Sequence, residues 1–229
     1  MHRRFSLGLS TALAFTLVSP AFANVIVASG AGSLPATAQN LTTLYPTEIT
    51  GSFDPGEPNS VNVFEIDIME PALFSAQTID PGAFGVDDPE LFLFDSSGNG
   101  VYMNDDETGG NTQACLPSAS ANPCPSSVPA GVNLTPGDYY LAIAYSENMP
   151  IDSLSNEIFS PALSTDVVGP NGGVGPVAGW DDNSFASPDT DLVNYQIDLS
   201  GTVPEAATGL LSATACIGFL ILRRRRTRL

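Results

Sequence analysis

The chain has no lysine, and its seven arginines all lie within the first four or the last seven of its 229 residues. Its one histidine is His2. The stretch from Asn24 to Glu205 contains all 25 acidic residues and no basic one, so its formal charge is −25, whereas the whole chain carries −18. Nucleic acid is therefore excluded as a partner of this stretch, because phosphate binding depends largely on Lys and Arg.

The same absences restrict catalysis. Without histidine or lysine in the middle of the chain, a Ser-His-Asp site, a Cys-His site or a lysine base cannot be assembled there. A pair of carboxylates suffices for glycoside hydrolysis, but the sequence marks out no such pair. We expect a protein that is not an enzyme, and a carboxylate-dependent hydrolase is the less favoured alternative.

Carboxylates without basic partners must be solvated, hydrogen-bonded or neutralised by a bound cation. Ca²⁺ needs several oxygen ligands, and no EF-hand pattern supplies them here. Two acidic clusters flank an expected hairpin of 91–94 and 101–103, which would bring their ends together. The candidate calcium ligands are Asp87, Asp88, Glu90, Asn104, Asp105 and Asp106. Further acidic groups occur at Glu107, at Asp181 and Asp182, and at Asp189 and Asp191. The alternative is a solvated acidic surface that maintains solubility.

The chain has only three cysteines. Cys115 and Cys124 bracket a turn-rich loop, and their short spacing suits a local disulfide in an oxidising compartment. A metal pair is the weaker alternative, since no His or further Cys is available in this part of the chain. Cys216 lies in an apolar run, where we interpret it as a small apolar residue.

Short apolar runs recur between Gly, Pro, Asn and Asp, and no run before Ala206 has a helical period. They predict an all-β sandwich of about eight or nine strands. Residues 91–94 are apolar on both faces, as expected for the middle of a sandwich. The long segment 146–189 is interpreted as a tolerated surface insertion, with a functional or mobile loop as the alternative. Trp180 within it is interpreted as a packing anchor rather than a sugar-stacking platform.

The N-terminus has the three parts of a secretory signal peptide. Arg3 and Arg4 precede a short apolar run, and small residues at 21–23 form a cleavage site. The run is too short to span a membrane. We expect signal peptidase to remove residues 1–23, so that the mature protein begins at Asn24.

The C-terminus combines an uncharged run at 206–222 with an arginine cluster, which predicts a transmembrane helix whose basic end stays on the inner side. With the residues before the run, this order resembles the PEP-CTERM sorting signal, although Ala206 replaces the final Pro of the Pro-Glu-Pro triplet. The resemblance implies that an exosortase processes segment 203–229. The residues that carry it are Val203, Pro204, Glu205, Ala206, Arg223, Arg224, Arg225 and Arg226. A plain membrane anchor is the alternative.

A second resemblance concerns the acidic body at 24–202. The runs DPELFLFDSSG at 88–98, NDD at 104–106, LTPGDYYLAI at 134–143 and YQIDLSG at 195–201 look like the bacterial pre-peptidase C-terminal (PPC) domain. The resemblance covers about residues 60–201. It implies a jelly-roll-like β-sandwich, an accessory module of secreted or surface proteins, some of which bind calcium or polymers.

These features predict a non-enzymatic protein that crosses the inner membrane and is anchored by its C-terminal helix until an exosortase acts. It would then sit at the cell surface or outside, associated with extracellular polysaccharide or a biofilm matrix. The alternative is a calcium-dependent module that binds carbohydrate or protein. Bound Ca²⁺ is the one cofactor that the sequence suggests.

Overall fold

The computed structural model describes residues 23–53, 60–82, 85–86, 88–107, 112–117, 124, 129, 131–160, 165–181 and 193–203. The expected cleavage segment up to residue 22, the span at 206–222 and the terminal arginines lie outside these residues, as do Pro204 and Glu205. Within the described part of the chain, no helix is both long and apolar enough to cross a membrane.

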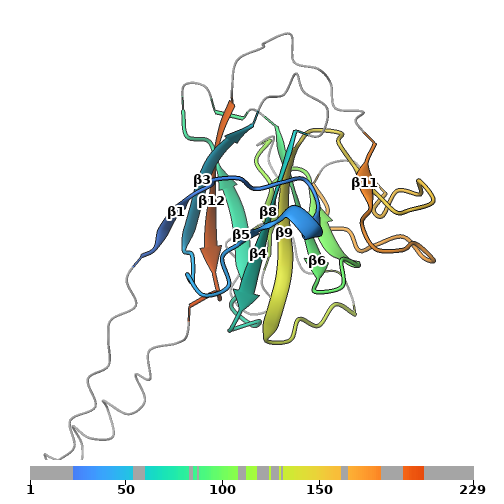
Figure 1. Ribbon diagram of the computed structural model, residues 1–229, viewed down its shortest axis with the longest axis horizontal. Helices are drawn as coiled ribbons and strands as arrows, with labels where there is room; N and C mark the ends of the chain where they lie inside the picture. Colours follow the sequence, from blue (N-terminus) through green and yellow to red (C-terminus); the bar gives the residue numbers. More distant parts are fainter. Residues whose placement is uncertain are drawn as a thin grey trace, which may run out of the picture. The chain divides into compact units, whose positions relative to one another are not determined.

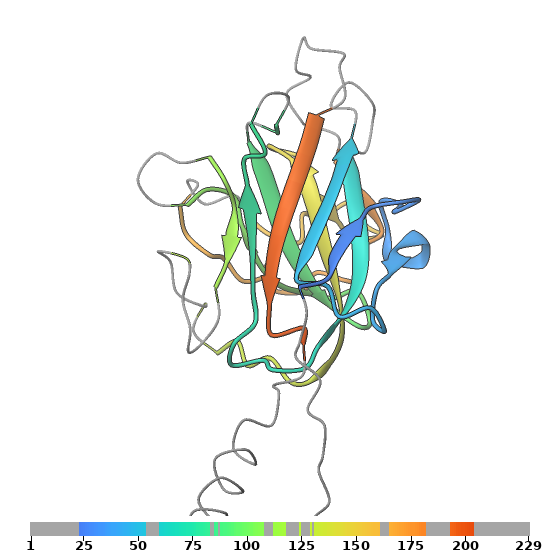
Figure 2. The ribbon, with the colours of Figure 1, turned by 90° about the vertical axis from the view of Figure 1, so that its left-hand side faces the viewer.

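Two five-stranded sheets pack face to face as an all-β sandwich (Figure 1). Sheet A has the order β1 (Val25–Val27), β3 (Glu48–Phe53), β12 (Val193–Ser200), β5 (Ser75–Ile79) and β8 (Cys115–Leu116). Sheet B has the order β2 (Gln39–Asn40), β4 (Val61–Ile68), β9 (Gly137–Tyr145), β6 (Pro89–Asp95) and β7 (Gly100–Asn104). A short 3-10 helix, η1 (Pro35–Thr37), precedes β2. Figure 2 looks onto sheet A, where β12 lies in orange between β3 and β5. The predicted all-β two-sheet architecture is confirmed.

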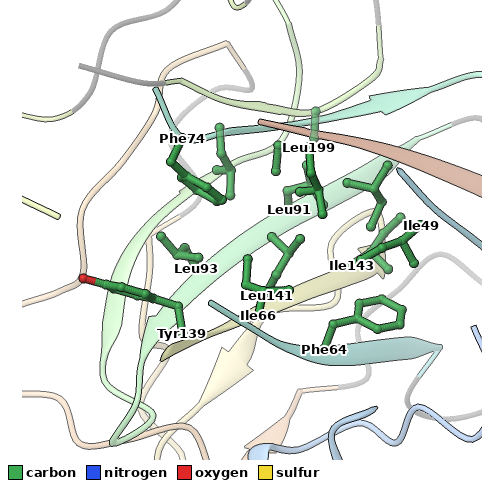
Figure 3. Close-up of a cluster of buried hydrophobic side chains, with 14 of the residues drawn as sticks. Ile49, Phe64, Ile66, Phe74, Leu91, Leu93, Tyr139, Leu141, Ile143 and Leu199 are labelled. Carbon is green, nitrogen blue, oxygen red and sulfur yellow. The ribbon is translucent and has the colours of Figure 1, made fainter. Parts of the chain in front are cut away.

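The main core fills the space between the two sheets. It forms because alternate side chains along the strands point into this space. On β12 the side chains of Tyr195, Ile197 and Leu199 are buried, while those of Asn194 and Asp198, on the other face of the strand, are exposed. Leu91, Leu141 and Ile143 from sheet B meet Ile49 and Leu199 from sheet A (Figure 3). Burying each such side chain stabilises the fold by about 1.5–3 kcal/mol relative to exposure. The two hydrophobic faces therefore hold the sheets together.

The expected hairpin forms from β6 and β7, which pair antiparallel with Leu91 opposite Asn104. At its closed end, Asp95 Oδ1 accepts hydrogen bonds from the backbone N–H groups of Ser97 at 2.8 Å and Asn99 at 2.9 Å. Gly98 has φ of 83°, a conformation that glycine adopts without strain. The turn fixes the register, so the chain just before β6 and just after β7 meets at the open end of the hairpin.

Part of the long segment forms a second hydrophobic layer instead of a surface insertion. Strands β10 (Pro150–Ile151) and β11 (Gly179–Trp180) pair antiparallel, and Ile158 and Phe159 are fully buried. The Phe92 ring lies 5.9 Å from that of Phe159 and 5.4 Å from that of Trp180, centroid to centroid. The tolerated-insertion interpretation is therefore wrong for 146–160 and 165–181. The physical reason is that the second face of sheet B is also apolar and needs a cover.

Trp180 is a packing anchor, as predicted. Its side chain is 5% exposed, and its indole Nε1 donates a hydrogen bond to the Ser33 carbonyl at 2.6 Å. The ring meets Phe92 edge-on at an interplanar angle of 74°. The indole therefore ties the second layer both to sheet B and to the segment before η1.

We expect Phe159→Ala to lower the free energy of unfolding by about 3–5 kcal/mol, because it opens a cavity in the second layer. Leu154→Ala is the matched control, since Leu154 lies in the same segment but is 79% exposed. Its effect should stay within about 0.5 kcal/mol. Urea unfolding of both variants measures the difference. Equal, small effects would mean that the segment is not part of the folded core.

Candidate metal centre

Three aspartates converge at the open end of the β6–β7 hairpin. Asp88 directly precedes β6, and Asp105 and Asp106 directly follow β7. One carboxylate oxygen from each lies within 4.8 Å of the other two, and all three residues are half-buried. Pairing of Leu91 with Asn104 brings the two sequence clusters together at this end. The triad could hold a metal ion.

Glu90 is buried beside this triad. It lies on β6 opposite Ala144 of β9 and is only 2% exposed. Its Oε1 accepts a hydrogen bond from the Glu147 backbone N–H at 3.1 Å. Among the described residues, no hydrogen bond reaches its Oε2, which is buried. Orphaned buried carboxylate oxygens are costly, so the arrangement favours either a bound proton or a cation.

Burial raises the pKa of Glu90 well above its ordinary value, and the charges of Asp105, Asp88 and Asp181 raise it further. The N–H group of Glu147 acts in the opposite direction but does not cancel these effects. Burial also raises the pKa of Asp105 to about 7, with further contributions from Asp106, Asp88 and Glu147. The carboxyl groups thus repel one another in a poorly solvated place.

The Asn104 side chain braces the loop that carries two of the aspartates. Its Oδ1 accepts a hydrogen bond from the Cys115 backbone N–H at 2.7 Å, and its Nδ2 donates to the Asp106 carbonyl at 3.0 Å. A disulfide bond joins Cys115 and Cys124, whose Cα atoms are 5.6 Å apart. The amide therefore connects the turn at 105–106 to the disulfide-bonded strand β8.

Two further acidic residues approach from the second layer, and sequence reasoning did not group them with the triad. Glu147 has φ of 62°, which is uncommon for a residue other than glycine, and this turn directs its N–H towards Glu90. The neighbouring Ser146 N–H donates to the Asp88 carbonyl at 2.9 Å. Asp181 Oδ1 accepts from the Met149 N–H at 2.9 Å. Of the other predicted ligands, Asp87 lies outside the described residues.

The donor set suits a hard cation. The three side-chain atoms of the triad are carboxylate oxygens, ligands that Ca²⁺ and Mg²⁺ take. Zinc sites usually draw on His or Cys, and both cysteines near this site are joined in a disulfide. Asp88, Asp105 and Asp106 could supply direct ligands, while Glu90 adds negative charge beside them. Ca²⁺ tolerates irregular coordination better than Mg²⁺ and is the better match to loop-borne carboxylates.

In the presence of a chelator, the stability of the protein should fall as the pH rises from about 5 to about 7. The raised pKa of Asp105, about 7, means that the folded protein keeps a proton that the unfolded chain has already lost. Stability from that proton is complete below the unfolded pKa and is lost as the pH passes the folded one. Thermal unfolding in EDTA measures it.

The variant Asp105→Asn serves as control for this pH dependence. It removes the titrating group and keeps the side-chain size, so its midpoint should change less between the same two pH values. A wild-type midpoint that stays constant or rises over that range would contradict the assignment of a raised pKa.

With the all-β sandwich and its acidic triad in place, comparison with protein-family models gives no match, and comparison with curated proteins gives none either.

Proposed function

We propose that this chain is a non-enzymatic, exported β-sandwich module that binds calcium at Asp88, Asp105 and Asp106. One observation supports the proposal above all others. Glu90 is 2% exposed, has an orphaned Oε2, and lies beside three clustered aspartates in a body without a single basic residue. The stretch from Asn24 to Glu205 contains no basic side chain, so these carboxyl groups are neutralised either by a bound cation or by a proton.

The energetics favour calcium over protonation at neutral pH. Keeping several carboxyl groups charged and close together without a counter-ion is costly, and a divalent cation removes that cost. Extracellular calcium modules bind with dissociation constants of about 10⁻⁴–10⁻³ M, which matches calcium concentrations outside cells rather than inside. The ion would fasten the β6–β7 hairpin at its open end.

The export part of the proposal comes from the two ends of the chain. The basic, apolar and small-residue segments at 1–23 support removal by signal peptidase. The PEP-CTERM-like order at 203–229 supports a transient anchor in the inner membrane and processing by an exosortase. The mature module would then reach the cell surface or an extracellular polysaccharide matrix. Its likeness to the PPC domain adds a jelly-roll-like topology to the proposal.

Calcium should raise the midpoint of thermal unfolding. For the full-length protein in a nonionic detergent, about 10 mM CaCl₂ is ten or more times the expected dissociation constant, which stabilises the fold by about 1.4 kcal/mol or more. This corresponds to a rise of a few degrees for a domain of this size. Differential scanning fluorimetry with CaCl₂, MgCl₂ and EDTA measures it. An unchanged midpoint with calcium would end the proposal.

The variant Glu90→Gln separates charge from packing in the same experiment. It keeps the shape of the buried side chain but removes its negative charge, so we expect a weaker calcium response and a metal-free protein at least as stable as the wild type. Asp198→Asn is the matched control, because Asp198 is exposed on β12 and faces away from the core. Its calcium response should equal that of the wild type.

Mass spectrometry of the intact protein from its native host tests export. We expect an N-terminus at Asn24 and a C-terminus that lacks the arginines at 223–226. Glu205→Ala should leave the first cleavage intact and block the second, since it alters the triplet that resembles the exosortase motif. Recovery of the unprocessed chain from the cytosol, with Met1 present, would contradict both cleavages.

A further inference from the structure

A cavity of about 620 Å³ is lined by residues of β1, β3 and β12 of sheet A, by Asn62 of sheet B and by the segments that follow β1 and β5. These three strands lie side by side in Figure 2. Thr50 and Ser52 from β3 and Asn194 and Gln196 from β12 line it, because alternate residues of these strands point away from the core. The volume lies within the range of small-molecule binding sites, about 300–1,000 Å³.

One residue of the lining, Tyr195, is held in place by its contacts. The Tyr195 side chain is 1% exposed, and its hydroxyl lies 2.7 Å from the side-chain amide of Asn62 at the start of β4. Gly51 allows this arrangement, since a Cβ at that position would overlap the Tyr195 hydroxyl. The phenol is thus held in place by Asn62 of sheet B and by the backbone of Gly51, which lies close to its hydroxyl.

The described residues that line the cavity include no carboxylate, although the stretch from Asn24 to Glu205 carries 25 acidic residues. Their polar groups are hydroxyls and amides, which donate and accept hydrogen bonds without charge. A cationic ligand would find no counter-charge among the described residues of the lining, and an anionic one would meet a strongly negative body without Lys or Arg. The chemistry selects an uncharged ligand with many hydroxyl groups.

Apolar surface completes the cavity. Val27 on the edge strand β1 is 70% exposed, and Ala28, Ala31 and Pro81 also form part of the lining. A sugar ring presents C–H groups on its faces and hydroxyls around its edge, so it can use both kinds of wall. The lining therefore combines a polar part, made of hydroxyls and amides, with a smaller apolar part.

We propose that this cavity is a binding site for neutral oligosaccharide. The inference rests on the proposed role as a binding module, but none of the metal-site residues lines the cavity. Sugar binding and calcium binding can therefore fail independently. The site would give the module a direct contact with an uncharged polysaccharide.

The test is isothermal titration calorimetry on the full-length protein in a polyoxyethylene detergent, which has no sugar headgroup. The probes are cello-, malto- and galacto-oligosaccharides of two to four units, each against an oligogalacturonate of matching length. We expect at least one neutral oligosaccharide to bind with a dissociation constant of about 1 mM or tighter. Failure of all neutral probes, or equal binding of the anionic ones, would overturn the proposal.

Two variants locate the binding. Ser52→Trp places a large ring in the cavity from an exposed position, and Asn194→Ala removes an exposed amide from its wall. Each should weaken neutral-sugar binding at least tenfold, and the calcium-induced rise in the melting midpoint should not change. Asn133→Ala, an exposed asparagine outside the cavity, is the control and should bind like the wild type. Undiminished binding by Ser52→Trp would show that the sugar sits elsewhere.

Discussion

The absence of basic side chains from the body is the constraint on which the electrostatics of this protein depend. In most proteins a buried carboxylate is paired with Lys or Arg. Between Asn24 and Glu205 there is no Lys or Arg, so no carboxylate can form such a pair within this stretch. Each carboxylate must then take hydrogen bonds from amides, remain in water, keep a proton or bind a cation. The described residues show carboxylates that use the first of these solutions, and one buried carboxyl group, that of Glu90, which receives only one amide hydrogen bond.

Two turns with the pattern Asp-Ser-x-x-Asn illustrate the first solution. Asp152 accepts hydrogen bonds from the N–H groups of Leu154, Asn156 and Gly175, just as Asp95 accepts them in the β6–β7 turn. The backbone and side-chain bonds from Asn156, followed by the bond from Gly175, lower the pKa of Asp152 to about 2. Here the N–H groups of the turn stabilise the charged carboxylate, as a basic residue would, so the carboxylate needs no bound ion.

Sequence reasoning was most reliable where a strand has one buried and one exposed face. The all-β sandwich and the β6–β7 hairpin were predicted correctly, because short apolar runs and a Gly-containing turn carry that information. The two-residue strands β2, β8, β10 and β11 are too short to show any period. The second layer was missed because Ile158, Phe159 and Trp180 are spaced irregularly in a segment rich in Gly and Pro.

The candidate metal centre also has a part that the sequence predicts and a part that it does not. Local sequence grouped Asp88 with Glu90 and Asp105 with Asp106, and the hairpin joined the two groups, as its register requires. The burial of Glu90 was not visible, because it depends on the second layer that covers the start of β6. Glu147 was missed for the same reason, since only its left-handed turn directs the N–H group to Glu90.

The second layer therefore has an electrostatic consequence as well as a packing one. It shields Glu90 from water but offers it only one N–H group, at Glu147, where Asp152 receives three. Shielding raises the pKa of Glu90, whereas full hydrogen bonding lowers that of Asp152. Glu90 and Asp152 thus differ in the number of backbone N–H groups that donate to them. A metal ion would stabilise the charged form most at Glu90, where these donors are too few.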